Sequence, residues 1–366
     1  MAPTQARSRT VDLNPRRRRI LKAVVDRHVR TATPVSSAAV VREYRLNVSP
    51  ATVRIEFAAL ERMGLVHQPH TSAGRIPSDQ GYRVYVDQIL VPPRLKHDER
   101  KMIQRTYKLR YGAVEEILHA TCHLLASLTG YAAIALFPLL EQERLRDLHL
   151  ACVNGRRILI MIVTNEGRVE HSVFHLPTPI SVKCLETVTR VLRERLRGMP
   201  LMRIVQVRVD DIISMELARE QCIDEFIITA LEMVQQTIQM HHQNRIFSEG
   251  LPQVLSQPEF EDVDKARALV EVFDHLGESA IIVPPCDTHP RHPWVAIGSE
   301  LLGGTARPPM EVLSECSFVG APYWVADKCA GTIGVLGPKR MRYGKAWSIV
   351  QHIARELSNT LTTLLA

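Results

Sequence analysis

The chain has 366 residues and a mass of 41.3 kDa, which predicts two or three domains. With 45% apolar and 23% charged residues, it has a globular composition, which excludes fibrous and largely disordered proteins. The longest nearly continuous apolar stretch, 131–140, is about half the roughly 20 residues that a membrane-spanning helix needs, so we expect no membrane segment. Seven scattered cysteines without a CxxC spacing, and an N-terminus without a signal peptide, predict a cytoplasmic protein with reduced thiols.

The net charge of +7 is concentrated at one end of the chain. Residues 1–95 hold 16 Lys and Arg and 7 Asp and Glu, a net charge of +9, whereas the remainder holds 30 and 32, a net charge of −2. A basic module ahead of a nearly neutral body is typical of a protein that binds the phosphate backbone of nucleic acid. A solvated basic tail would have the same charge, so the local pattern has to decide.

The basic segment contains three helix signals in a row. Asn14-Pro15, Ser36 and Ser49-Pro50 each place a capping residue at the start of a helix, and the first helix runs to about Arg30. Gly64 is the expected end of the third helix. The first turn of the first helix is crowded with cations, which the helix dipole disfavours, so a nearby phosphate explains them better than local stability does. These cations are Arg16, Arg17, Arg18 and Arg19.

The second and third helices, joined by a tight turn, predict a helix-turn-helix whose third helix enters the major groove. After it, a polar loop turning near Ala73-Gly74 predicts a β-hairpin wing, and Ser78 caps a fourth helix. We expect base contacts from Thr52 and Arg54, with Ser49 holding the cap and as a candidate contact to phosphate. Backbone contacts are expected from the basic turn and from the wing, namely from His70, Thr71, Ser72 and Arg75.

Periodicity in the body predicts a mixture of sheet and helix, an α+β class. Strands at 145–153, 156–164 and 168–176 form an antiparallel meander, and a helix follows over 181–197. Strand signals return at 294–298, 316–326 and 331–336, and the chain ends in a helix. The pattern of residues 99–128 predicts a helical segment that links the wing to the body.

Two segments resemble the winged helix of the HrcA family of bacterial heat-inducible transcription repressors, namely Val48–Arg54 and Pro69–Asp87. A third, Gly331–Met341, is similar to the C-terminal signature of that family. The resemblance implies a winged helix, a GAF-like domain and an inserted dimerisation segment. From this resemblance we expect the winged helix at residues 1–95, the two parts of the GAF-like domain at 96–204 and 291–366, and the insertion at 205–290.

The resemblance also implies a function. Members of the family bind as homodimers to an inverted-repeat operator of the CIRCE type upstream of chaperone operons, and their activity is modulated by the chaperonin. The chain departs from the family at Ile55, where Asn is common, so a base contact of the third helix is expected to differ.

An apolar stripe in the predicted insertion has two interpretations. Such a stripe at helical spacing is usually intramolecular core, but it can equally join two chains. The resemblance favours the dimer. The four residues are Ile227, Leu231, Val234 and Ile238.

Other patterns are weak indicators of chemistry. Gly331, Gly334 and Gly337 match no nucleotide-binding motif and indicate close packing in strands. Cys286, His289 and His292 have a spacing able to hold a metal, but prolines around them favour an exposed loop, so we expect no metal or cofactor. No catalytic motif occurs. The alternatives to a chaperone-gene repressor are a winged-helix regulator switched by a metal or small molecule and, third, an enzyme with a nucleic-acid module.

Overall fold

The computed structural model describes residues 11–45, 47–71, 73–108, 114–136, 143–165, 167, 169–209, 212, 221–243, 246–274, 292–302 and 309–365. Helices combine with antiparallel sheets, so the predicted α+β class is confirmed. The chain divides into two compact units, which are treated separately below. Unit 1 comprises Met1–Pro138 with Ile246–Ala366, and unit 2 comprises Leu139–Arg245.

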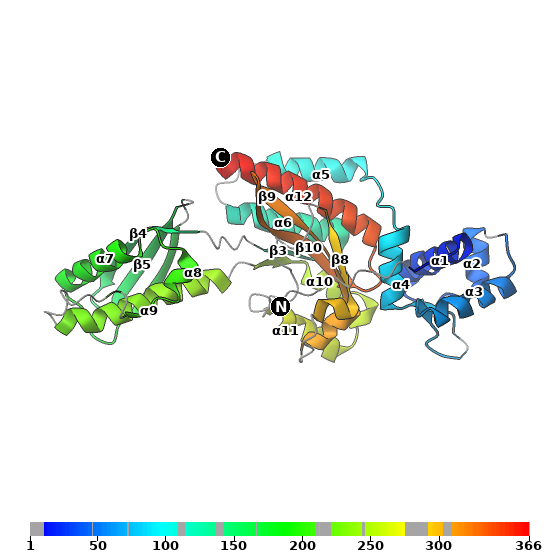
Figure 1. The fold of residues 1–366 in the computed structure, drawn as a ribbon, viewed down its shortest axis with the longest axis horizontal. Coiled ribbons are helices and arrows are strands. Elements are labelled where there is room, and N and C mark those ends of the chain that lie inside the picture. The colour runs from blue at the N-terminus through cyan, green and yellow to red at the C-terminus, as the bar shows by residue number, and fades with distance from the viewer. Residues whose placement is uncertain are drawn as a thin grey trace. The chain divides into compact units, whose positions relative to one another are not determined.

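The first part of unit 1, here called the N-terminal module, covers residues 11–89. Its elements are α1 (Pro15–Thr31), α2 (Ser37–Tyr44), α3 (Pro50–Arg62), β1 (Val66–His67), β2 (Ile76–Pro77), α4 (Asp79–Val84) and a π-helical turn, Tyr85–Ile89. The four α-helices begin where the sequence predicts, because the side chains of Asn14, Ser36, Ser49 and Ser78 each accept a hydrogen bond from the backbone N–H three residues later. The result is a set of three helices followed by a short antiparallel hairpin (Figure 1).

The rest of unit 1 is built on a five-stranded antiparallel sheet. Its strand order is β7 (Ile246–Glu249), β3 (Ala132–Leu136), β10 (Lys328–Pro338), β9 (Cys316–Val325) and β8 (Trp294–Ile297). The last three strands were predicted, whereas β3 and β7 were not. Strand β3 lies inside the apolar stretch first weighed as a membrane segment. Both faces of β3 are buried, so it lacks the apolar–polar alternation by which a half-exposed strand is recognised.

Helices cover both faces of this sheet (Figure 1). One face packs against α6 (Val114–Thr129) and α12 (Tyr343–Leu365), with α5 (His97–Lys108) outside them. The other face packs against α10 (Leu251–Leu255), α11 (Val263–Asp274) and three 3₁₀ segments, namely Pro258–Phe260, Gly298–Leu302 and Met310–Glu315. The glycine pattern in β10 serves close packing, as predicted, since a Cβ at Gly334 would overlap the Phe318 ring.

Unit 2 contains a three-stranded sheet with helices on one face. The strands are β4 (Leu145–Asn154), β5 (Arg157–Thr164) and β6 (Val169–His175), and the helices are α7 (Val182–Leu196), α8 (Leu201–Ile204) and α9 (Gln221–Gln243). The predicted meander and the helix after it are therefore confirmed. Among the described residues, these strands pair only with one another and not with the sheet of unit 1.

This pairing changes the division of the chain. The expected ranges joined the meander to the second sheet-forming segment and began the insertion at residue 205. In the structure the segment between the two parts of unit 1 is 139–245, and it includes the meander. Alternation along a strand reports that one face is buried, but it does not report which sheet the strand joins.

The apolar stripe of α9 is core of unit 2. Ile227, Leu231 and Val234 are each at most 1% exposed and Ile238 is 5% exposed, within one apolar cluster that includes β5 and α7. Side chains already buried within their own chain have no surface left for a second chain. The interpretation of this stripe as the contact between two chains is therefore corrected to intramolecular packing.

No helix in the described part of the chain is long and apolar enough to cross a membrane. The structure describes the side chains of five cysteines, at positions 122, 152, 184, 316 and 329, and each is a free thiol. Burial raises the pKa of the Cys122 thiol to about 12, so this thiol is protonated at neutral pH.

Candidate nucleic-acid interface

Helix α3 presents one face to solvent because its other face is anchored. Val53, Phe57 and Leu60 are buried in the core of the N-terminal module. The first turn is fixed by Ser49, whose Oγ accepts from the Thr52 N–H at 3.1 Å and lies 3.0 Å from the Thr52 hydroxyl. The structure thus supports the capping role predicted for Ser49, and it orients Thr52 on the half-exposed edge of the helix.

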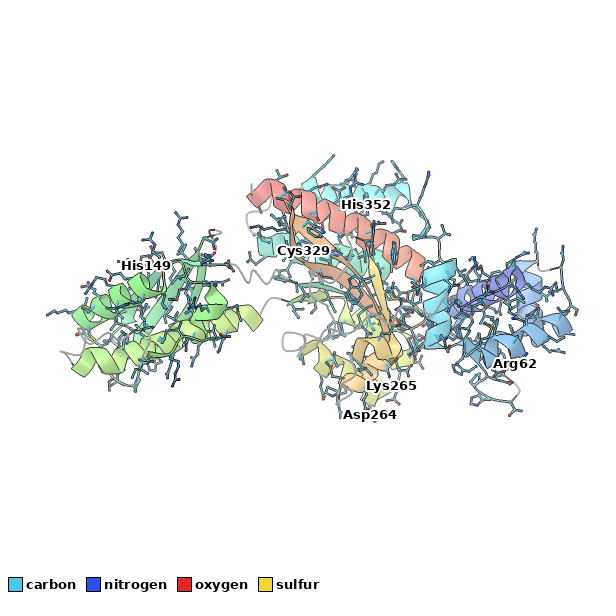
Figure 2. The ribbon with its side chains drawn as sticks, in the orientation of Figure 1. Arg62, His149, Asp264, Lys265, Cys329 and His352 are labelled. Atoms are coloured by element: carbon cyan, nitrogen blue, oxygen red, sulfur yellow. The ribbon has the colours of Figure 1, made fainter. Side chains whose placement is uncertain are left out.

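The exposed face of α3 combines small, apolar and cationic side chains. Its exposed members, after Pro50, are Ala51, Arg54, Ile55, Ala58 and Arg62. Arg54 makes no ion pair with any residue that the structure describes, so its guanidinium is available to a ligand. Arg62 extends from the far end of the same helix (Figure 2). Its Nε donates to the carbonyl of Ala58 at 3.4 Å.

The basic first turn of α1 divides into two pairs of arginines. Arg17 Nε donates to Glu56 Oε2 at 2.9 Å, and Arg16 Nη1 lies 3.8 Å from Glu56 Oε1. Arg18 and Arg19 are exposed and form no ion pair with the described residues. Sequence reasoning treated the four as equivalent phosphate ligands. It missed Glu56, whose place on α3 opposite this turn depends on how the two helices cross.

The hairpin loop is attached to the rest of the module through Arg75 and Gly74. Arg75 Nη2 lies 3.0 Å from Glu61 Oε2 of α3, and the backbones of Arg75 and Val35 exchange two hydrogen bonds of 2.9 Å. A Cβ at Gly74 would overlap the backbone of Val35, so only glycine allows this approach. The Arg75 side chain is only 17% exposed. In the free protein its role is therefore to join the loop to α3.

The remaining loop positions differ in what the structure describes. His70 and Thr71 are exposed, whereas Ser72 lies outside the described residues. Gln68 Nε2 donates to the carbonyls of Thr71 at 2.8 Å and Ala73 at 3.0 Å, which closes the loop on itself. His70 and Thr71 therefore lie on a loop that is stabilised by hydrogen bonds within the loop itself.

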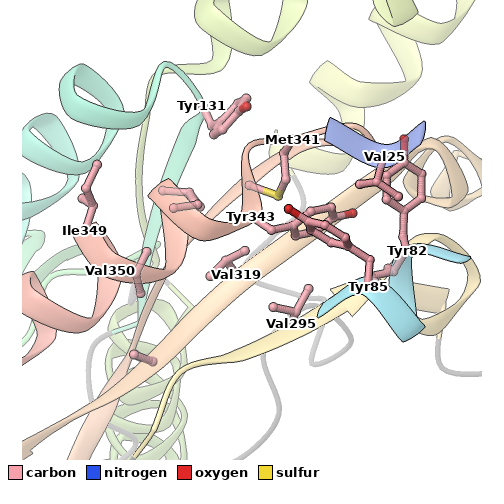
Figure 3. Close-up of a cluster of buried hydrophobic side chains, with 14 of the residues drawn as sticks. Val25, Tyr82, Tyr85, Tyr131, Val295, Val319, Met341, Tyr343, Ile349 and Val350 are labelled. Atoms are coloured by element: carbon pink, nitrogen blue, oxygen red, sulfur yellow. The ribbon is translucent and has the colours of Figure 1, made fainter. Parts of the chain in front are cut away.

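A partly buried polar junction connects the N-terminal module to the five-stranded sheet. Lys339 Nζ lies 3.0 Å from Asp79 Oδ1 of α4. Arg83, also on α4, donates to the Val295 carbonyl at 2.8 Å and forms an ion pair with Glu300. The Tyr82 ring packs at a tilt of 51° against the Tyr343 ring, with ring centroids 5.8 Å apart, and Figure 3 shows Tyr82 and Tyr85 beside Met341 and Tyr343.

Arg340 forms the second half of this junction. Its guanidinium binds both carboxylate oxygens of Glu259, with Nη2 to Oε2 at 3.0 Å, and its Nη1 donates to the carbonyl of Val29 in α1 at 3.4 Å. His28, the residue before Val29, pairs through Nδ1 with the Tyr82 hydroxyl at 2.7 Å. Burial, and next the charge of Arg340, lower the pKa of His28 to about 4, so this histidine is neutral at pH 7.

Sequence reasoning predicted none of the contacts between the N-terminal module and the sheet that form this junction. The signal was nevertheless present, because Asp79, Tyr82 and Arg83 lie in one of the segments that carry the family resemblance and Lys339 and Arg340 lie in another. The structure brings these two segments together. The junction couples the orientation of α1 and α4 to the sheet.

The metal-binding pattern is only partly covered by the structure. Cys286 and His289 lie outside the described residues, and His292 lies at the edge of the described range 292–302. Among the described residues, no group of three or more His, Cys, Asp or Glu side chains is placed to hold a metal ion.

Comparisons with known proteins identify relatives along almost the whole chain. The family model described as the HrcA protein C terminal domain matches residues 115–346. The heat-inducible transcription repressor HrcA of Pelotomaculum thermopropionicum is 34% identical over 353 residues, which cover 96% of this chain and 98% of that protein. The protein of the same name from Moorella thermoacetica is 35% identical over 353 residues, covering 96% and 99%.

A solved structure has a similar fold. The crystal structure of a hypothetical protein superposes with a TM-score of 0.56 at 22% sequence identity, covering 96% of this chain and 99% of that one. At this identity the likeness concerns the fold alone.

Proposed function

Since this chain belongs to the HrcA family of heat-inducible transcription repressors, we propose that it represses chaperone genes by binding an inverted-repeat operator of the CIRCE type as a homodimer. In this proposal the N-terminal module is a winged helix, and α3 lies in the major groove. One observation carries the proposal: the face of α3 that holds Arg54 is uncovered, in the module that holds the excess positive charge.

The residues divide into two roles. Arg54 and Thr52 contact bases, because an arginine fork matches guanine O6 and N7 and a hydroxyl bonds either type of base edge. Arg18 and Arg19 contact phosphates, which carry no sequence information. Arg16 and Arg17 join them when DNA competes with Glu56. His70, Thr71 and Ser72 of the wing loop are the remaining candidates for backbone contact.

The roles are tested by measuring the affinity of two variants for an operator duplex and a random duplex over a range of salt concentrations. Arg54→Ala should lose about 1–3 kcal/mol on the operator and little on random DNA. Arg18→Ala should weaken both duplexes alike and reduce the salt slope by about 0.9 for one lost phosphate contact. Equal losses on both duplexes for both variants would contradict the division.

A dimer is proposed because an inverted repeat has two-fold symmetry and two half-sites must be held at a fixed distance. Unit 2 offers a surface for it other than the buried stripe. The face of its sheet away from α7 and α9 carries an apolar row in which Val173, Leu159 and Ala151 are neighbours across the strands. Met161 and Val169 lie on the same face, and Val169 and Val173 are more than half exposed.

The test of this surface is sedimentation of the variant Met161→Glu/Val173→Glu. It should be a folded monomer with weakened operator binding, because charges cannot be buried between two copies without partners. Ile228→Glu, on the exposed side of α9, is the matched control and should leave the dimer intact. A dimeric double variant would place the contact elsewhere.

The proposed switch is the chaperonin, whose help is withdrawn when heat-unfolded proteins occupy it. A feature of the fold supports it: β3 pairs with β10 across about 200 residues of sequence, and such long-range pairing slows folding and exposes apolar surface. Operator occupancy should rise when chaperonin and ATP are added, and fall when an unfolded competitor is supplied. Occupancy that ignores chaperonin but is abolished by a chelator would favour a metal-switched regulator.

A further inference from the structure

Ile55 is an exposed apolar side chain in a module whose other described large apolar side chains are not exposed. It is 69% exposed, whereas Val53, Phe57 and Leu60 on the same helix are each at most 4% exposed. In the described part of residues 11–89, Ile55 is the only exposed large apolar residue. Neither core packing nor helix propensity accounts for it, because Ile contacts little there and is a poorer helix former than Ala.

The neighbours of Ile55 leave room for a close approach. Ala51 lies one turn before it and Ala58 one turn after it, and both are exposed. Neither alanine extends beyond Cβ, so the backbone of α3 can lie close to a flat or concave surface while Ile55 projects toward it. A partner that fits this face therefore has a narrow surface that a single helix can contact closely.

The charges around Ile55 identify the kind of partner. Arg54 and Arg62 share its face of α3, and Arg18 and Arg19 stand on the helix whose first turn meets α3 through Glu56. An apolar protein surface would gain nothing from these cations, whereas duplex DNA combines a dense negative charge with one apolar group in its major groove. That group is the C5-methyl of thymine.

We propose that Ile55 reads thymine, by packing its side chain against the C5-methyl group in the major groove. The inference rests on the proposed DNA-binding function of α3 and adds the base that this position selects. In this arrangement Arg54 supplies the polar contact and Ile55 the apolar contact to neighbouring base pairs. A cytosine, which lacks the methyl group, would leave Ile55 in water.

Replacing thymine by uracil removes only this methyl group and keeps the pairing and the polar groups of the base. Duplexes that bind the full chain are first selected from a randomised library, and each thymine of the preferred half-site is then replaced by deoxyuridine in turn. We expect one position per half-site at which wild-type affinity falls about three- to tenfold, the effect of one buried methyl group.

Two variants complete the experiment. Ile55→Ala should bind the thymine duplex as weakly as wild type binds the uracil duplex, and should no longer distinguish the two. Val263→Ala is the matched control, because Val263 is a 70% exposed β-branched residue of α11, and it should behave as wild type. Because Ile55 is exposed, its truncation is expected to leave the fold intact, which a thermal melt verifies.

The outcomes separate this inference from the function on which it rests. Specific binding with no uracil-sensitive position, or with the same sensitivity in Ile55→Ala as in wild type, overturns the role of Ile55 and leaves the proposed function standing. A wild-type protein that selects no sequence from the library contradicts the proposed function itself, and the inference falls with it.

Discussion

Arg17 of α1 donates to Glu56 of α3 at 2.9 Å, and this hydrogen bond links the basic turn to the helix proposed to read bases. Glu56 is only 8% exposed and also lies within 3.8 Å of Arg16. A single carboxylate therefore neutralises part of the basic turn in the free protein. When DNA binds, phosphates have to compete with it.

We predict that Glu56→Gln binds random duplex DNA more tightly than wild type at low salt. Loss of the carboxylate charge frees Arg16 and Arg17 for phosphates, and each new contact should steepen the salt dependence of the binding constant by about 0.9. The measurement is a salt titration of duplex affinity. Glu43→Gln is the control, since Glu43 on α2 pairs with Arg27 and Arg30, to which the proposal assigns no phosphate contact, and its loss should leave the slope unchanged.

A second prediction concerns Arg340, which donates hydrogen bonds to both carboxylate oxygens of Glu259 and whose side chain is 12% exposed. Arg340→Lys keeps the charge but loses the fork that binds two oxygens at once, so the free energy of unfolding should fall by about 1–3 kcal/mol. Denaturant unfolding measures this loss. Lys345→Arg, on α12 at a partly exposed ion pair with Glu99, should have almost no effect. Equal effects would show that the bidentate grip adds no stability.

The predictable parts of the structure are those with local causes. The helix starts at Asn14, Ser36, Ser49 and Ser78 follow from side-chain caps, which act over three residues. The meander follows from alternation and from turn residues. The role of Ser49 in the candidate site could likewise be anticipated, because the cap and the helix it supports are adjacent in sequence.

The features that escaped prediction depend on contacts between distant segments. The pairing of Arg17 with Glu56 requires the crossing of two helices, and the pairing of β3 with β10 brings together strands far apart in the chain. For α9, the spacing of Leu231 and its neighbours identified an apolar face correctly. It could not say whether that face packs within one chain or between two, because the same spacing serves both.

The burial of this stripe gives a third prediction. Leu231→Ala should destabilise unit 2 by about 2–5 kcal/mol, because it removes a side chain that is 1% exposed and leaves a cavity. Thermal unfolding of the full chain measures this, with Ile228→Ala as control, since Ile228 is 40% exposed on the same helix and should change stability by less than about 1 kcal/mol. A folded, fully stable monomer from Leu231→Ala would restore the interpretation of the stripe as an intermolecular contact.

The last prediction follows from His28 at the junction. Its pKa is about 4 in the folded protein, lowered by burial and by Arg340, against 6.5 as the ordinary value. As the pH falls below 6.5, the unfolded chain takes up a proton that the folded protein does not bind, so protonation favours unfolding. The stability due to neutral His28 is therefore complete above pH 6.5 and is lost progressively as the pH falls from 6.5 to 4.

His28→Gln removes this titration while keeping a side chain able to hydrogen-bond the Tyr82 hydroxyl. At pH 5 wild type should have lost about 1–2 kcal/mol more than His28→Gln, relative to pH 7.5. Denaturant unfolding at both pH values provides the comparison, and His70→Gln, at an exposed loop position, should follow the wild-type profile. The difference should appear in unit 1, because His28 links α1 to α4 there. Parallel pH profiles for wild type and His28→Gln would mean that this histidine accepts a proton in the folded protein and that the junction tolerates its charge.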